Sequence, residues 1–154
     1  RTREDILLKF LNVIAQGGNY LLNIGPRPDG KIPEQEARIL NYVGTFINRY
    51  AEAIYGTRAG IPRICYGGPS VRKGNTLYLF AVNPPLKELT VKGVAGKLEK
   101  VVHLASGKKL SYRRTGGRPA HGHPAWIRIA VPETSGPYPE VYKLVFQEPL
   151  EVKR

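Results

Sequence analysis

The sequence has 154 residues, with 24 lysines and arginines against 12 aspartates and glutamates, which gives a formal net charge of +12. Its single cysteine excludes a disulfide within the chain and a zinc site built from cysteines. No apolar run approaches the roughly 18 residues of a membrane span, so we expect no membrane segment. The sequence contains no methionine, and its α/β start and β-rich remainder favour a piece of a longer protein.

The excess of positive charge has two interpretations. A basic chain can bind nucleic acid or another polyanion, or it can be balanced by an acidic region that precedes it. The basic residues run from Arg1 to Arg154, with one denser patch over residues 108–123. Nucleic-acid binders usually concentrate their charge among aromatic residues, so this dispersion disfavours nucleic acid as a partner.

An amphipathic helix is the first predicted element. Thr2 and Asp5 have the spacing of a helix start, and the Gly17-Gly18 pair supplies a C-terminal cap. Between them, apolar residues recur at near-helical spacing: Ile6, Leu7, Phe10, Leu11, Val13 and Ile14.

A short strand is expected over Tyr20–Ile24. It is apolar almost throughout, as in a parallel-sheet strand buried on both faces. The prolines and glycines of residues 25–30 end it, and Pro33 suits the first turn of a second helix. The apolar stripe of that helix is Ala37, Leu40, Val43, Phe46, Ile47 and Tyr50.

Beyond about residues 56–62 the helical period disappears. Short strand-like runs follow, separated by turn signals such as Asn83-Pro84-Pro85, and this pattern predicts an antiparallel sandwich. We expect residues past about 60 to fold on their own. The predicted strands are Leu77–Val82, Leu89–Val94, Leu98–Leu104, Lys109–Arg113, Ala125–Val131 and Val141–Phe146.

Several segments, in this order and spacing, resemble α-L-fucosidases that retain anomeric configuration. They are Gly17 to Pro26, Asp29-Gly30, Ile32-Pro33, Tyr50 to Thr57 and His103 to Leu110. The resemblance implies an α/β plus all-β architecture. Residues 1–58 would be the last βα unit of a (β/α) TIM-like catalytic barrel, and residues 59–154 a C-terminal antiparallel β-sandwich.

The resemblance implies hydrolysis of terminal α-L-fucosides by a two-step retaining mechanism, without a cofactor. The family's aspartate nucleophile and its usual glutamate acid/base precede the segment seen here, so no catalytic residue is assigned and the isolated chain is expected to be inactive. The implied partners are a fucosylated glycan or fucoside, and the missing N-terminal catalytic region in cis or in trans. An oligomer is favoured for the full enzyme. The compartment is unknown, with the cytoplasm slightly favoured.

Three residues near the end of the Tyr20–Ile24 strand are candidates for substrate binding. Asn23 interrupts an apolar strand, and a buried amide needs partners; it contacts the sugar or a catalytic group, or it anchors the following loop. Arg27 faces the sugar's entrance or is solvated. Asp29 sits where barrel active sites are built, although Asp29-Gly30 is foremost a turn signal.

Two other features offer weaker functional interpretations. His121 and His123 would share one face of an extended segment, but no third ligand is evident, so a metal site is not predicted. Trp126 is a conceivable sugar-stacking platform, while a core or half-buried tryptophan is the commoner outcome.

The alternative function is a non-catalytic basic β-sandwich module that binds glycans or polyanions. The part of the chain that precedes Gly56 discriminates between the two hypotheses. A free-standing module has no use for one orphan βα unit whose strand exposes its edges, which is an aggregation liability.

Overall fold

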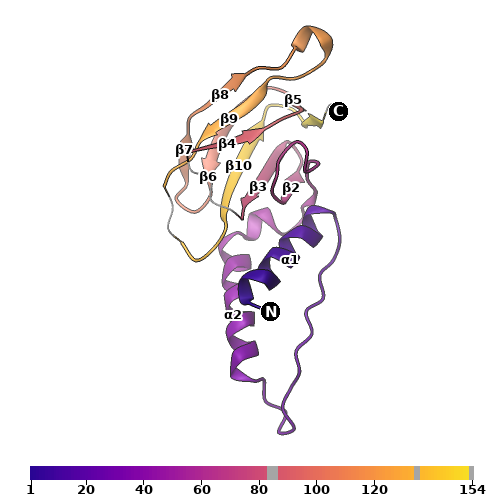
Figure 1. Cartoon of the computed structure of the whole chain (residues 1–154), viewed down its shortest axis with the longest axis vertical. Helices are drawn as coiled ribbons and strands as arrows, with labels where there is room; N and C mark the ends of the chain where they lie inside the picture. The colour runs from indigo at the N-terminus through magenta and orange to yellow at the C-terminus, as the bar shows by residue number, and fades with distance from the viewer. Residues whose placement is uncertain (83–86, 134–135, 153–154) are drawn as a thin grey trace.

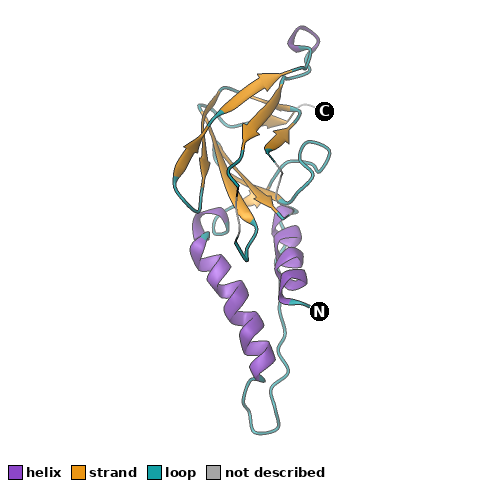
Figure 2. Cartoon of the chain, turned by 60° about the vertical axis from the view of Figure 1, so that its left-hand side comes forward, coloured by secondary structure: helices purple, strands orange, loops and turns teal. Residues whose placement is uncertain are grey.

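The computed structural model describes residues 1–82, 87–133 and 136–152 of the chain. Two helices lie at one end of the molecule and the sheets at the other (Figures 1 and 2). The helical elements are α1 (Arg3–Ala15), α2 (Glu34–Arg49) and the single 3-10 turns η1 (Ala51–Ala53) and η2 (Pro119–His121). The strands are β1 (Arg58–Ala59), β2 (Ser70–Lys73), β3 (Thr76–Ala81), β4 (Glu88–Val91), β5 (Val94–Ala95), β6 (Leu98–His103), β7 (Lys108–Leu110), β8 (Tyr112–Thr115), β9 (Trp126–Ala130), β10 (Glu140–Phe146) and β11 (Glu151–Val152).

Helix α1 begins and ends as its sequence predicts. The Asp5 N–H donates to Thr2 Oγ1, and the Thr2 N–H donates to Asp5 Oδ2, each over 3.1 Å, which is a reciprocal capping box. At the other end, Gly17 has φ +80°. The N–H groups of Gly17 and Gly18 donate to the carbonyls of Ile14 and Val13, and this Schellman motif satisfies the last turn.

The expected strand Tyr20–Ile24 does not form in the structure of this chain. The segment is not helical, but it pairs with no described strand. Tyr20 and Leu22 pack toward the helices, whereas the Leu21 side chain is 84% exposed. A strand needs a neighbour for its N–H and C=O groups, and the described chain offers none here. Figure 1 shows this connection running well away from α1 before it returns to α2.

The β-rich half confirms the antiparallel prediction. The largest sheet has the order β1-β2-β3-β10-β6-β7, a second has the order β4-β9-β8, and β11 pairs with β5. Every strand pair in the described part of the chain is antiparallel. The short strands β1, β2, β5 and β11 were not predicted. The predicted turn Asn83-Pro84-Pro85 lies outside the described residues.

The six-stranded sheet is covered on both faces. Between it and the three-stranded sheet lies one core cluster, to which Leu79, Leu144 and Ile127 belong. On its opposite face, Tyr78, Phe80 and Val141 pack against both helices. The molecule is therefore three layers deep: helices, large sheet and small sheet. Two-sided burial explains why all six residues of β3 are buried, in place of the alternation of a one-sided strand.

Helix α1 also reaches the sandwich at the predicted boundary. The Gly60 N–H donates to the Ala15 carbonyl over 3.2 Å. A Cβ at Gly60 would lie 2.2 Å from the Ser70 carbonyl oxygen, so only glycine permits this approach.

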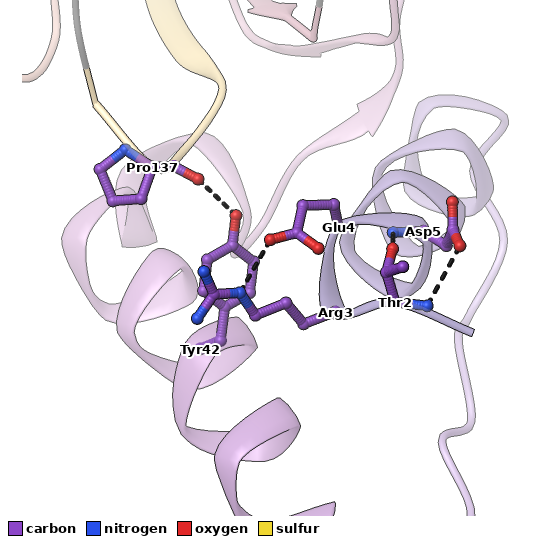
Figure 3. Close-up of polar contacts among 6 residues, drawn as sticks. All are labelled: Thr2, Arg3, Glu4, Asp5, Tyr42 and Pro137. Carbon is purple, nitrogen blue, oxygen red and sulfur yellow. Dashed lines mark hydrogen bonds and ion pairs between the residues drawn. The ribbon is translucent and has the colours of Figure 1, made fainter. Parts of the chain in front are cut away.

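A second contact joins the helices to the segment that precedes β10. The Tyr42 hydroxyl on α2 donates to the Pro137 carbonyl over 2.5 Å, and the Tyr42 ring stacks on Tyr138 with centroids 4.7 Å apart. From α1, the Arg3 guanidinium lies 4.5 Å from the centroid of the same Tyr42 ring. Figure 3 shows Arg3, Tyr42 and Pro137 converging beside the start of α1. Tyr42, which was outside the predicted apolar stripe, therefore connects three segments.

Candidate functional site

The loop between the extended segment and α2 is a tight, internally bonded turn. The Arg27 N–H donates to the Lys31 carbonyl, and the Gly30 N–H donates to the Arg27 carbonyl, each over 2.8 Å. Asp29 Oδ1 accepts from the Lys31 N–H over 3.2 Å, which is the contact of an Asx turn. The turn interpretation of Asp29 thus has a direct structural basis.

Arg27 and Asp29 lie together, on the surface. Arg27 Nε is 3.7 Å from Asp29 Oδ1, with side chains 62% and 45% exposed. An ion pair this exposed contributes at most about 1 kcal/mol to stability. Both side chains are therefore available to a ligand at little energetic cost.

Asn23 occupies a different position. It is exposed, and its side chain makes no hydrogen bond to any described residue, so the expectation of a buried amide is wrong. The expected burial depended on strands on both sides of Tyr20–Ile24. Asn23 instead lines a cleft of about 370 Å³ between the extended segment and the helices, together with Ile6, Ile24, Glu36 and Ile39.

Glu36 is the residue of this cleft that sequence reasoning missed. Its carboxylate accepts from the Gly25 N–H over 2.8 Å and so ties the end of the extended segment to the first turn of α2. In the sequence, Glu36 is one of two acidic residues in the first turn of α2, where acids are common because of the helix dipole. Irregular chain separates Gly25 from Glu36, so their contact produces no periodic pattern in the sequence.

The three histidines do not form a metal centre. Among the described residues, no group of three or more His, Cys, Asp or Glu side chains could hold a metal ion. His121 and His123 lie at η2 and the hairpin after it, where the His123 N–H donates to the Arg118 carbonyl. His103 is buried, with Nδ1 2.8 Å from Ser106 Oγ and Nε2 2.7 Å from Glu140 Oε2. Since both its nitrogens are bonded, His103 fixes the β6–β7 turn to β10.

Neither helix in the described part of the chain is both long and apolar enough to cross a membrane.

Comparison with known proteins gives these features a context. The α-L-fucosidase family model matches residues 1–52. Tissue α-L-fucosidase from Homo sapiens is 41% identical over 56 residues, which are 36% of this chain and 12% of that protein. α-L-Fucosidase from Dictyostelium discoideum is 32% identical over 53 residues, 34% of this chain and 12% of that protein.

Residues 1–52 are thus similar in sequence to α-L-fucosidases.

Beyond that segment, the similarity to fucosidases is seen in the three-dimensional structure. α-L-Fucosidase isoenzyme 1 from Paenibacillus thiaminolyticus superposes with a TM-score of 0.80 over 96% of this chain and 35% of its own, at 23% identity. The Thermotoga maritima α-fucosidase gives a TM-score of 0.74 over 94% of this chain and 34% of its own, at 28% identity. The chain spans about one eighth of the curated relatives it matches and about one third of these solved fucosidases.

The sequence match and the fold match have different lengths. The matched residues 1–52 contain both helices, the turn at Asp29 and the cleft at Asn23. All the described strands lie beyond residue 52, where the similarity to fucosidases is one of fold. The sequence match therefore covers the helical end of the molecule, where Asn23, Arg27 and Asp29 lie.

Proposed function

We propose that this chain is part of an α-L-fucosidase, a glycoside hydrolase that releases terminal α-L-fucose with retention of configuration. The observation that carries the proposal is the family match over residues 1–52, joined to a fucosidase fold over nearly the whole chain. Retaining hydrolysis needs two carboxyl groups about 5–5.5 Å apart on either side of the glycosidic bond. We assign both to a region outside this sequence.

In the proposed enzyme, Tyr20–Ile24 is the last strand of the catalytic barrel. Support comes from the extended but unpaired segment and from the apolar side chains that it leaves in water. Leu21 is 84% exposed and Ile24 is 38% exposed. Burial of a leucine or isoleucine side chain contributes about 1.5–3 kcal/mol, so a flanking strand would be favoured here. Residues 1–58 are then the end of the barrel, and residues 59–154 the sandwich domain.

The same proposal gives a role to the residues at the end of the segment. Active sites of (β/α) barrels form at the C-terminal ends of the strands. Asn23 would offer its free amide to a sugar hydroxyl or to a catalytic carboxyl. Arg27 and Asp29, exposed on the following turn, would line the entrance.

An assay with an aryl α-L-fucoside tests the function. The purified chain alone is expected to show no turnover, because it lacks the paired carboxyl groups. Addition of a fucosidase polypeptide that contains the rest of the barrel is expected to restore turnover. Turnover by the chain alone, abolished by Asp29→Ala, would overturn the proposal.

The reconstituted enzyme also tests the site. Loss of a hydrogen bond to the substrate or a catalytic group costs about 1–3 kcal/mol, so Asn23→Ala should lower kcat/KM about 5- to 150-fold. Asn41→Ala is the matched control, since it removes the same amide from an exposed position on α2. Equal kinetics for the two variants would remove Asn23 from the site.

A further inference from the structure

The outer face of the three-stranded sheet carries an unusual set of side chains. In β9, Ile127 and Ile129 are fully buried in the core, which leaves Trp126 and Arg128 on the opposite face. The register places Thr115 opposite Trp126, and Arg113 opposite Arg128. In Figure 1, β8 and β9 lie toward the end of the molecule opposite α2, and the Asn23 cleft is lined by other residues.

One carboxylate orders the arginines of this face. Glu88 on β4 accepts from Arg113 over 2.7 Å and from Arg128 over 2.8 Å. Arg128 Nε also donates to Thr115 Oγ1 over 2.8 Å. The hydrogen bonds from Arg128 and Arg113 lower the pKa of the Glu88 carboxyl, so it is ionised at neutral pH. Arg128, bonded on two sides, is thereby held in one position.

Two cations lie close to the Trp126 ring. The Lys92 ammonium is 4.4 Å from the centroid of its ring, and the Arg128 guanidinium carbon is 5.6 Å from the same centroid. Among the described residues, Lys92 has no carboxylate within ion-pair distance. The 36% exposed tryptophan thus has Lys92 and Arg128 beside its ring, and Arg113, on β8, lies next to Arg128. Among the described residues, Glu88 is the carboxylate that pairs with these arginines. This leaves a local excess of positive charge beside an aromatic ring.

We propose that this face, defined by Trp126, Lys92, Arg128 and Arg113, binds a sulfated oligosaccharide. A partly exposed indole offers an apolar surface to the C–H groups of a sugar ring. A sulfate ester is ionised throughout the physiological pH range and presents three oxygens to the cations. Its charge complements the face. The inference is independent of the fucosidase proposal, because it involves none of the residues of the Asn23 cleft.

The chain contains its own reporter for this site. Trp126 is the only tryptophan in the sequence, so a ligand on this face should change the tryptophan fluorescence directly. The probes are chondroitin sulfate, the same polysaccharide after chemical desulfation, and poly(U) RNA. We expect saturable fluorescence change with chondroitin sulfate, at least tenfold weaker binding after desulfation, and weaker binding of poly(U). Affinity should fall as salt rises, because salt screens surface charge.

Two variants with the same change in net charge separate this face from the charge of the whole chain. Lys92→Gln should weaken chondroitin sulfate binding at least fivefold. Lys9→Gln, at an exposed position of α1, should change it less than twofold. Equal weakening by both variants, an unchanged tryptophan signal, or equal binding of the desulfated polysaccharide would overturn the proposal. Tighter binding of poly(U) would overturn it in favour of a nucleic-acid surface.

Discussion

Two buried tyrosines of the sandwich core differ in what their hydroxyl groups contact. The Tyr66 hydroxyl donates to the Phe80 carbonyl over 3.0 Å. The Tyr142 hydroxyl is buried and has no hydrogen-bond partner among the described residues. Burial raises the pKa of both phenols, that of Tyr142 to about 12. A buried donor without a partner costs about 1–3 kcal/mol, so the two hydroxyls should affect stability with opposite sign.

We therefore expect Tyr142→Phe to raise the free energy of unfolding by about 1 kcal/mol, and Tyr66→Phe to lower it by a similar amount. In a chain of this length that is a change in Tm of about 2–4 °C. Urea and thermal unfolding at pH 7 measure both variants. A Tyr142→Phe protein as destabilised as Tyr66→Phe would show that the Tyr142 hydroxyl has a partner.

The raised pKa of Tyr142 also predicts how the stability of the chain changes at alkaline pH. The ordinary pKa of tyrosine is 10.0, and the folded-state value for Tyr142 is about 12. A raised folded-state pKa means that its contribution to stability is complete below pH 10 and is lost as pH rises through 12. Tyr142→Phe should remove this part of the alkaline loss of stability.

At the scale of single residues, the sequence predicts contacts between near neighbours but not contacts between distant segments. The turn role of Asp29 could be predicted, because an Asx turn depends on residues two apart. The exposure of Asn23 could not, since it depends on whether strands flank the segment. The cations around Trp126 were also unpredictable, because Lys92 comes from a distant, earlier segment of the chain.

At the scale of the element, α1 depends on its reciprocal cap. The Thr2 backbone N–H and its hydroxyl group bond the Asp5 carboxylate and lower the pKa of that carboxyl. A lowered folded-state pKa means that the carboxylate stabilises the fold above the ordinary value of 3.8. That contribution is lost as pH falls through the lower, folded-state value.

Thr2→Ala should lower the free energy of unfolding by about 1 kcal/mol, the usual effect of removing an N-terminal cap. Asp5→Ala should destabilise the chain at pH 7, and the difference from the parent should shrink below pH 3.8. Urea titrations at pH 7, 5 and 3 measure this difference. A constant difference across that range would mean that Asp5 acts without its charge.

Elements with strong local patterns could be predicted from the sequence. Both helices have a 3.6-residue apolar period and recognisable ends, and the main strands alternate between turn signals. The Tyr20–Ile24 strand could not be assigned correctly, because an apolar run becomes a strand only beside another strand. The very short strands β1, β5 and β11 have two residues each, too few to show a period.

At the scale of the whole molecule, the helices and the sandwich share a core. Phe46 on α2 is fully buried, and its ring lies 6.3 Å from that of Phe80 on β3. The proposed boundary near residue 58 marks a change in sequence pattern. Residues on both sides of it nevertheless belong to one apolar cluster. This changes the expectation that the sandwich folds on its own, since the helices cover one face of its main sheet.

Phe46→Ala tests this coupling. We expect it to cost about 3–5 kcal/mol and to lower amide protection in β3 as well as in both helices, as measured by hydrogen exchange of the full chain. Leu21→Ala is the control, because its side chain is 84% exposed and its effect should stay within about 0.5 kcal/mol. Undiminished protection of β3 in Phe46→Ala would instead make residues 59–154 an independent folding unit.

The central place of β10 has a consequence for how the chain is synthesised. This strand lies between β3 and β6, and it contributes Val141 to one core and Leu144 to the other. It leaves the ribosome about 65 residues after β3, which is roughly 3–13 s at ordinary rates of translation. During that interval β3, and β6 once it has emerged, present open edges that another chain can pair with. Nascent chains of this protein should therefore need a chaperone's protection until β10 has emerged.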